Sequence, residues 1–338
     1  MESGETSGTI PPQLYSLYDY EMKQDDENIV IEIKIPANVN SSEIKISIDD
    51  GIISVHYQEH PPLIEGKLSN EIESIESVTN QDQILKVNLK KKNTDFWHTL
   101  VQCRNPLNNN IDAKSSFTLY VLYDSFGTTF IDKDTALVYL NYSSALGYVP
   151  ALRTLSGIMF EEGHPDDGIS LLKVAGEKYR DPLSLYDIGL IYVHDSKTRA
   201  QGYGYLTRSS ELGYRPAHTV LGQLYSPLSK FEFQNKSPFE ALRHFDMAIS
   251  GKNDDPIALH EMAKLIYNGV GTDKSEKYAK WLQSIAEKID PSIEPLEEKE
   301  NVPENEEKNS KALIIGITVA ALTLFGVAVF KFSNRRKK

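Results

Sequence analysis

An internal repeat constrains the fold of this chain more than any other feature. The segments LNYSSALGYVPA (140–151) and LTRSSELGYRPA (206–217) share eight of twelve residues and begin 66 positions apart. This spacing equals two periods of about 33 residues, the length of one helix–turn–helix unit in stacked repeat proteins. Such units bury their apolar faces only against neighbouring copies. The repeat therefore predicts an all-α solenoid of about five helical hairpins over residues 115–289.

Small residues recur with the same period. In the first helix of a hairpin a small residue is followed by another five positions later, and in the second helix it is followed by a bulky residue four positions later. Small side chains let paired helices approach closely, and bulky ones fill the space against the next hairpin. The first-helix positions are Ala151, Ser184, Ala217 and Ala258, then Ser156, Gly189, Gly222 and Ala263; the second-helix pairs are Ala136 with Leu140, Gly168 with Leu172, Gly202 with Leu206, and Ala241 with Phe245.

Glycine and proline mark the expected helix ends. Gly147 and Gly213 suit left-handed helix caps, and a proline suits the first turn of a helix because its missing N–H costs nothing there. With its A-x-x-x-L-G and A-x-x-x-L cores, the region resembles Sel1-like repeats, which are close relatives of TPR repeats. The resemblance implies a concave groove for an extended or helical peptide. The prolines that open first helices are Pro150, Pro182, Pro216 and Pro256.

Some TPR domains hold the C-terminal tails of Hsp70 or Hsp90 in a clamp of Lys, Asn and Arg side chains on their first helices. The first helices here read FTLYVLYDSFG, PALRTLSGIMF and DPLSLYDIGLIY. They offer Arg153 as the one candidate cation and no Asn. This chain is therefore not expected to carry that clamp.

Residues 15–104 alternate with period two instead. Apolar side chains recur at every second residue from Ile29 to Ile35, and again from Ile44 to Ile48 and from Ile53 to Tyr57, with an Asp50-Gly51 turn between the last two runs. Alternation of this kind is typical of strands with one buried face, and Asp-Gly is a hairpin turn signal. A further strand is expected over Ile84 to Leu89. Six or seven short strands without helices predict a compact antiparallel sandwich.

Five motifs in this region occur in the order found in the CS domain, the fold of the p23 and Sgt1 co-chaperones. They are Tyr18-Asp-Tyr20, IVIEIKIP (29–36), PPLIEGKLSNEI (61–72), the strand from Ile84 and the closing FWHTLV (96–101). The LIEGKLSNEI stretch resembles the NudC branch most. Tyr20 stands where the family usually has Trp, and Trp97 is expected to be a core residue. The resemblance implies client or Hsp90 binding without catalysis, but it identifies no contact residue.

The C-terminal region contains an uncharged apolar run from Ala312 to Phe330. Nineteen residues at about 1.5 Å per residue span roughly 28 Å, close to the hydrocarbon core of a bilayer. The N-terminus has no apolar signal-peptide core, so we expect a single-pass tail anchor with the preceding residues facing the cytosol. The lone Cys103 agrees with a reducing compartment.

The residues after this run are basic, and they bear on which membrane is chosen. Positive charges resist transfer into the secretory lumen, and a short basic-flanked anchor resembles those of mitochondrial-type outer membranes. We therefore expect the outer membrane of a mitochondrion-related organelle, with the endoplasmic reticulum membrane as the alternative. The expected anchor is bounded by Ala312 and Phe330, and the expected targeting tail comprises Lys331, Arg335, Arg336, Lys337 and Lys338.

The parts of the chain differ in net charge. The net charge is −12, and because residues 311–338 contribute +6, the rest of the chain carries −18. This excess argues against a nucleic-acid partner and would steer cationic targeting peptides toward the protein. Residues 290–310 hold eight carboxylates and three prolines, a composition typical of disorder. The expected division is a disordered N-terminus (1–14), a CS-like domain (15–104), a linker (105–114), helical repeats (115–289), an acidic flexible tether (290–311), the anchor (312–330) and the basic tail (331–338).

Catalysis, metal binding and cofactor binding are not expected. The eight histidines are scattered, HExxH and CxxC motifs are absent, and no Gly-rich phosphate loop or GxSxG occurs. His56 and His60 bracket the end of an expected strand, so they do not share the face of a helix as a metal pair would. The pairs Asp166-Asp167 and Asp254-Asp255 precede expected helices and fit helix caps.

Together the three parts resemble the tail-anchored receptor subunits of the outer-membrane protein translocase in protists with hydrogenosomes or mitosomes. The resemblance implies a membrane-tethered receptor or co-chaperone that docks precursor proteins for import. Expected partners are precursors with targeting signals, cytosolic Hsp70 or Hsp90, translocase channel subunits and the lipid bilayer. Two alternatives remain open. One is a scaffold or Hsp90 co-chaperone adaptor in quality control at the endoplasmic reticulum, and the other is an adaptor in dynein-linked trafficking.

Overall fold

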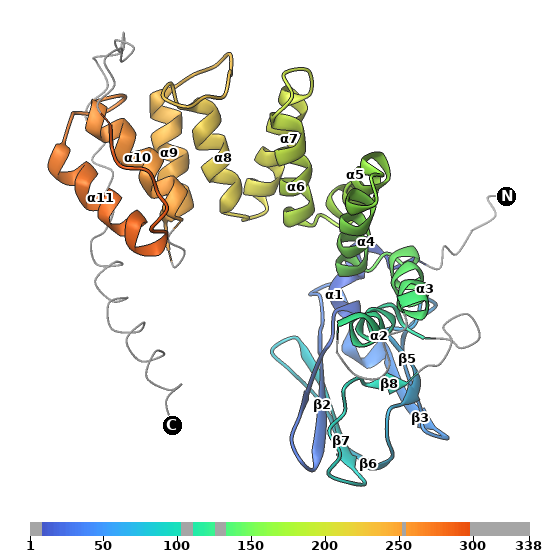
Figure 1. Cartoon of the computed structure of the whole chain (residues 1–338). Coiled ribbons are helices and arrows are strands. Elements are labelled where there is room, and N and C mark those ends of the chain that lie inside the picture. The colour runs from blue at the N-terminus through green and yellow to red at the C-terminus, as the bar shows by residue number, and fades with distance from the viewer. Residues whose placement is uncertain (1–8, 103–110, 126–132, 252–254, 298–338) are drawn as a thin grey trace. The chain divides into compact units, whose positions relative to one another are not determined.

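The computed structural model describes residues 9–102, 111–125, 133–251 and 255–297 and contains two compact units, Met1–Ser184 and Leu185–Lys338. Strands occupy the N-terminal part of the chain, and helices follow (Figure 1). The predicted order of an antiparallel sandwich and then a helical-repeat array is confirmed. The expected anchor and basic tail, 312–338, lie outside the described residues.

The sandwich has two antiparallel four-stranded sheets. The alternation predicted for β2 is confirmed, because Ile29, Ile31 and Ile33 are fully buried. Asp50 and Gly51 form the predicted turn with φ of 51° and 75°. The first sheet has the order β1 (Glu21–Gln24), β2 (Asn28–Lys34), β7 (Ile84–Lys91), β6 (Ile72–Gln81), and the second β3 (Ile44–Asp49), β4 (Ile52–Tyr57), β5 (Ile64–Leu68), β8 (Val101–Gln102).

Two details of the sandwich differ from expectation. Eight strands are present in the described part of the sandwich, and short helices accompany them: η1 (Pro12–Leu14), α1 (Tyr15–Tyr18) and η2 (Ser41–Glu43). The edge strand β6 lacks apolar alternation because neither of its faces is buried; Ile75 and Val78 are exposed. Trp97 is buried at 1% exposure, which confirms its expected place in the core.

Ten α-helices follow in the described residues, and consecutive helices pair as antiparallel hairpins. A π-helical turn, Val174–Lys178, continues α5. The helices are α2 (Ala113–Ser125), α3 (Lys133–Ala145), α4 (Val149–Glu161), α5 (Pro165–Lys173), α6 (Pro182–Val193), α7 (Arg199–Glu211), α8 (Pro216–Tyr225), α9 (Pro238–Ile249), α10 (Pro256–Asn268) and α11 (Glu276–Ile289).

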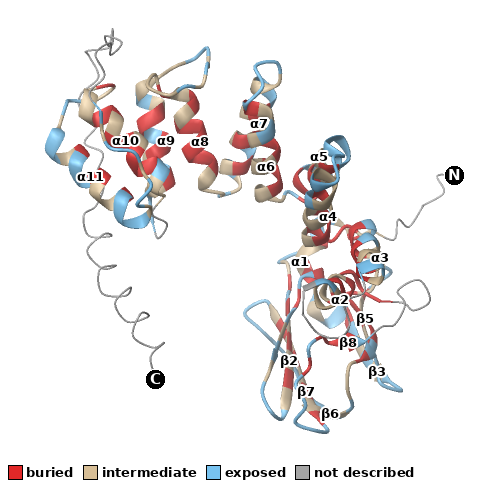
Figure 2. Ribbon diagram, in the orientation of Figure 1, coloured by how far each residue is buried: buried red, intermediate tan, exposed pale blue. Residues whose placement is uncertain are grey.

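The small and bulky positions of the repeat pack as the sequence predicts. A Cβ added at Gly189 would lie 2.7 Å from the Leu206 side chain, and one at Gly222 would lie 2.5 Å from the Phe245 ring. Both distances are shorter than van der Waals contact, so glycine is required for this helix spacing. Ala217, Ala241 and Ala258 are fully buried. The buried residues line the facing sides of the helices (Figure 2, red).

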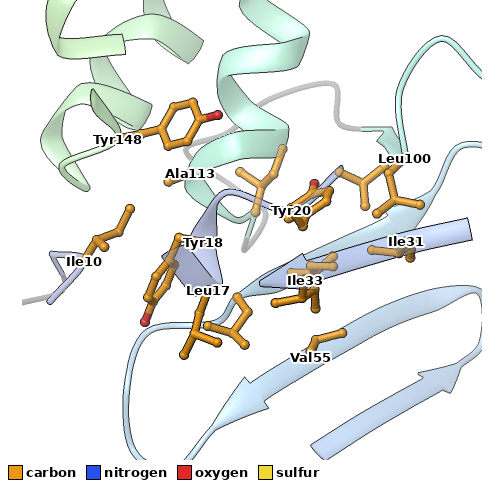
Figure 3. Packing of buried hydrophobic residues seen from close by; sticks show 14 of the residues in the cluster. Ile10, Leu17, Tyr18, Tyr20, Ile31, Ile33, Val55, Leu100, Ala113 and Tyr148 are labelled. Atoms are coloured by element: carbon orange, nitrogen blue, oxygen red, sulfur yellow. The ribbon is translucent and has the colours of Figure 1, made fainter. Parts of the chain in front are cut away.

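In the first unit, the sandwich and the first two hairpins share one hydrophobic core (Figure 3). The Tyr20 hydroxyl lies 2.7 Å from Ser115 Oγ, and the Val149 N–H donates to the Tyr15 hydroxyl at 3.1 Å. Asp112 accepts from the Ser115 N–H at 2.9 Å and from the Glu65 N–H at 3.2 Å. We call this shared interface of the sandwich with α2–α4 the seam.

Three expected boundaries change. Residues 9–14 are ordered, because Ile10 is buried and its N–H donates to the Leu146 carbonyl at 2.8 Å. The expected linker is corrected at its C-terminal end, where Ile111 and Asp112 are buried in the seam and α2 begins at Ala113. Residues 290–297 of the expected tether pack against the last hairpin, since Ile293 and Leu296 find apolar partners there. Apolar residues within a polar segment account for all three.

Candidate functional site

The second unit contains a groove of about 910 Å³ beside α10. One face of α10 forms its floor, and α8 and the ends of α6 and α7 contribute further side chains. The loop between α8 and α9 forms one wall. The chain that follows α11 also lines the groove. We call this site the α10 groove; its lining residues are His194, Arg199, Gln223, Leu228–Glu232, His260, Glu261, Lys264, Asn268, Ser292–Pro295 and Glu297.

A segment of the chain itself, residues 291–297, lies beside α10 and forms one side of the α10 groove. Asp290 follows α11 directly, and its carboxylate accepts from the Ser292 N–H and hydroxyl at 2.9 and 2.7 Å, which turns the chain. The Ile293 N–H also donates to the Asp290 carbonyl at 3.2 Å, and after this turn residues 293–297 form neither helix nor strand and run beside α10 (Figure 1). Ile293 and Leu296 pack, half-buried, against the core of the last two hairpins. We call residues 291–297 the resident segment.

Two side-chain amides bind the main chain of the resident segment. Gln283 Nε2 donates to the Glu294 carbonyl at 2.9 Å, and Asn268 Nδ2 donates to the Glu297 carbonyl at 3.4 Å. Gln283 lies next to His260 of α10, and Asn268 follows eight residues later, about 12 Å further along the helix axis. The three residues from the Glu294 carbonyl to the Glu297 carbonyl cover about 10 Å when extended. The segment therefore runs alongside α10 for about two turns. Contacts to carbonyls are independent of side-chain identity, which suits the recognition of an extended peptide.

The orientation of the Gln283 amide is fixed by its neighbours. Gln283 is only 5% exposed, and its Oε1 lies 2.8 Å from His260 Nδ1. Its Nε2 also donates to Glu287 Oε1 at 2.9 Å. A carbonyl can only accept a hydrogen bond, so the Gln283 oxygen must face a protonated His260 Nδ1 and its amide hydrogens must face Glu294 and Glu287. The donor is thus held in place for a peptide carbonyl.

The wall formed by residues 226–237 is ordered by hydrogen bonds and aromatic packing. Arg199 Nη1 donates to the Glu232 carbonyl at 2.7 Å, and Lys236 Nζ donates to the Ser226 carbonyl at 2.7 Å. Burial lowers the pKa of Lys236, and the nearby Arg199 lowers it further. Phe233 packs with its ring centroid 5.4 Å from that of Tyr203. The wall is therefore preorganised.

The charges of the α10 groove suit an acidic occupant better than a cationic one. Apart from the resident segment, its lining carries the cations Arg199, Lys230 and Lys264 and the anions Glu232 and Glu261. The resident segment adds the carboxylates of Glu294 and Glu297. The strong negative charge that the whole sequence carries is not concentrated in this groove.

The residues singled out by sequence analysis are not brought together here. Ala312, Phe330, Lys331, Arg335, Arg336, Lys337 and Lys338 all lie outside the described residues. Within the described ranges, no helix combines the length and apolar character needed to cross a bilayer. Nor do those ranges hold a cluster of three or more His, Cys, Asp or Glu side chains suited to a metal ion. His56 instead lies 3.0 Å from the Glu65 carboxylate.

Sequence reasoning missed the resident segment, although a signal for it exists. Asp-Pro opens α6 at Asp181-Pro182 and α10 at Asp255-Pro256, and the same pair recurs at Asp290-Pro291. In all three places the carboxylate accepts from an N–H two or three residues later. A further first helix would begin here, but Pro295 falls at its fifth position, where a backbone N–H is needed. The chain therefore starts like another repeat but forms no helix in residues 291–297.

Residues 18–91 match the model of the CS domain family. Among solved structures, a Sel1 repeat protein from Oxalobacter formigenes is 16% identical with a TM-score of 0.46, over 53% of this chain and 72% of that chain. The nuclear movement protein from E. cuniculi GB-M1 is 27% identical with a TM-score of 0.22, over 25% of this chain and 98% of that chain.

A protective antigen of uropathogenic Escherichia coli strains, with an SLR fold, is 21% identical with a TM-score of 0.43, over 52% of this chain and 38% of that chain. No curated protein sequence matches the chain. The family match confirms the resemblance to the CS domain over residues 18–91. The chain thus combines a CS domain over residues 18–91, which indicates a chaperone-associated role, with a helical-repeat array.

Proposed function

We propose that this protein is a non-catalytic docking protein that binds extended segments of partner proteins in the α10 groove. The observation that carries the proposal is the pair of hydrogen bonds from Gln283 and Asn268 to main-chain carbonyls of the non-helical resident segment. Side-chain amides that bind a peptide backbone accept many sequences, as a receptor for varied partners requires. The CS domain fits a role beside chaperones and their clients.

We further propose that docking takes place at a membrane. The uncharged run Ala312–Phe330, with Lys331 and the basic residues after it, supports a membrane anchor. In this arrangement the protein is a receptor on the outer membrane of a mitochondrion-related organelle. Its partners are precursor proteins, the Hsp70 or Hsp90 chaperones that deliver them, and the subunits of a translocase channel.

The docking role is tested with the purified full chain and a fluorescent, unfolded precursor protein. Gln283→Met keeps the length of the side chain but removes its amide donors, and it should weaken binding about tenfold. Gln201→Met makes the same change on the exposed face of α7 and should leave binding unchanged. Equal affinities of all three proteins would place precursor binding outside the α10 groove.

The membrane role is tested separately by localisation. Replacing Arg335, Arg336, Lys337 and Lys338 with Ser should move a tagged full chain toward the endoplasmic reticulum, because basic charge opposes insertion there. Unchanged localisation of this variant at an organelle outer membrane would show that the address lies elsewhere. Localisation of the unaltered protein at the endoplasmic reticulum would favour the role of scaffold or Hsp90 adaptor there.

A further inference from the structure

We propose that the face of α10 and α11 covered by residues 291–297, at one side of the α10 groove, is a site for acidic peptides with two apolar residues three positions apart, and that the resident segment is its built-in occupant. Partner peptides of this class then bind by displacing residues 291–297. This inference deepens the proposed docking function and rests on it, since it names the class of segment that the groove accepts and the device that limits access.

The first support is the conformation of the resident segment. A simple cap for the last repeat would be a further helix, and Asp290-Pro291 begins one with the same aspartate bonding that opens α10. Pro295 prevents its continuation, and Glu294, which precedes a proline, is disfavoured in helical conformation. The segment therefore stays non-helical beside α10 (Figure 1), and its carbonyls accept from Gln283 and Asn268.

The second support is the division of contacts between main chain and side chains. Gln283 and Asn268 bind carbonyls, which any peptide offers. Ile293 and Leu296 pack against the apolar residues of the last two hairpins, whereas Glu294, Pro295 and Glu297 remain exposed. The apolar pair therefore sets the register of a bound peptide. Because both apolar side chains are only half-buried, they hold the segment weakly enough for exchange.

The third support is electrostatic. Arg199, Lys230 and Lys264 line the same groove as the acidic segment. Lys264 is already paired with Glu261 at 3.0 Å, which leaves the groove neither strongly basic nor acidic. An acidic peptide is favoured modestly, and a cationic one gains nothing from these three side chains. The precursor segments proposed to dock here are therefore acidic and apolar ones, and not cationic targeting peptides.

The direct covalent connection to α11 makes the resident segment a strong competitor of free peptides. A short connection gives an effective concentration in the millimolar range, and Asp290 joins the segment to α11 without any intervening linker. If a free peptide of the same sequence binds with a Kd of about 0.1 mM, about 1 mM of tethered competitor weakens its apparent affinity about tenfold. Release of the segment should recover this factor.

The test uses the purified full chain and a fluorescent peptide with the sequence DPSIEPLE, which copies residues 290–297. Its affinity is measured by fluorescence anisotropy for wild type and for the double variant Ile293→Ser/Leu296→Ser. We expect the double variant to bind the peptide at least tenfold more tightly. Ile257→Ser, at an exposed position of α10, is the control and should bind like wild type.

Two further proteins guard against a folding artefact. Asp290→Ala removes the side-chain bonds of the turn and leaves both apolar residues in place, so it should raise peptide affinity in the same direction by a smaller factor. Adding Gln283→Met to the released double variant should abolish the gain. Circular dichroism of each variant must match wild type in helix content.

Three results would overturn the inference. They are equal peptide affinity in wild type and the released variants, absence of saturable binding to the released variants, and equal binding of the charge-reversed peptide DPSIKPLK. The precursor assay described above is independent of these outcomes. A groove that binds DPSIEPLE while Gln283→Met leaves precursor binding unchanged would sustain this inference and refute precursor docking in the groove.

Discussion

Tyr20 and Ser115 are 95 residues apart in the sequence, and their hydroxyl oxygens lie 2.7 Å apart inside the protein. Tyr20 precedes the first strand of the sandwich, and Ser115 lies in the first turn of α2. Both residues are 3% exposed. The CS domain and the first helical hairpins are therefore joined by a buried, hydrogen-bonded seam. The two parts belong to one compact unit.

Tyr20→Phe should lower the free energy of unfolding of the first unit by about 1 kcal/mol, the net value of one buried hydrogen bond. Ser115→Ala should cost a similar amount. Because each change breaks the same bond, the double variant should cost about 1 kcal/mol less than the sum of the two. Urea unfolding followed by Trp97 fluorescence, in a Trp281→Phe background, measures all three. Strict additivity would show that the two hydroxyls do not interact.

Asp112 should make the stability of the first unit depend on pH. Burial raises the pKa of Asp112 to about 6, although hydrogen bonds from the backbone N–H groups of Ser115 and Glu65 oppose the rise. The folded state therefore binds a proton more tightly than the unfolded state. The stabilisation is complete below the unfolded pKa of about 3.8 and is lost as the pH rises through about 6.

Between pH 4.5 and 7.5 this linkage should remove about 2 kcal/mol of stability from the wild type relative to Asp112→Asn, which does not titrate. Urea unfolding with the same Trp97 probe at both pH values gives the difference. Asp134→Asn, an exposed control in α3, should leave the pH dependence unaltered. Parallel pH profiles for wild type and Asp112→Asn would show that Asp112 does not titrate in this range.

Gly222→Ala tests the close packing of α8 on α9. The new methyl group would lie 2.5 Å from the Phe245 ring, and overpacking of this kind costs about 2 kcal/mol. A Cβ added at Gly204 in α7 would have no neighbouring atom within 4 Å, so Gly204→Ala should instead stabilise the helix by about 1 kcal/mol. The midpoints of thermal unfolding of Gly222→Ala, Gly204→Ala and wild type measure both effects. Failure of Phe245→Leu to restore part of the loss in Gly222→Ala would argue against the steric cause.

The elements that the sequence predicts well are those whose periodicity reflects burial. In β2, Ile29, Ile31 and Ile33 alternate because one face is buried, and Gly189 and Gly222 recur because each faces a bulky side chain of the next helix. Strand β6 was not predicted because it is an edge strand with two exposed faces. A strand of this kind leaves no alternation in the sequence.

The seam and the α10 groove depend on contacts that no local pattern contains. Asp112 lies in a segment whose composition is typical of a linker, and its role depends on the Glu65 N–H, 47 residues away. Gln283 occupies an ordinary helical position until His260 and the Glu294 carbonyl are placed around it. The repeated Asp-Pro pair signals a third repeat start at Asp290, but the outcome depends on Pro295.

Membrane attachment through Ala312–Phe330 predicts the behaviour of a truncated protein. Removing residues 311–338 should leave the protein soluble after carbonate extraction of membranes, whereas the full chain should remain in the pellet. The physical reason is the loss of an apolar segment long enough to cross the hydrocarbon core. Carbonate-resistant association of the truncated protein would show that another part of the chain holds it to membranes.

Site-specific crosslinking tests the central claim, that partner segments bind in the α10 groove, most directly. A photoreactive residue replaces Gln223, which lines the groove from α8, or Glu211, which is exposed at the end of α7. Each full-length protein is irradiated with a purified, labelled precursor protein. The account predicts a crosslinked product at position 223 that an excess of DPSIEPLE suppresses, and none at position 211. Equal crosslinking at both positions, or none at 223, would contradict it.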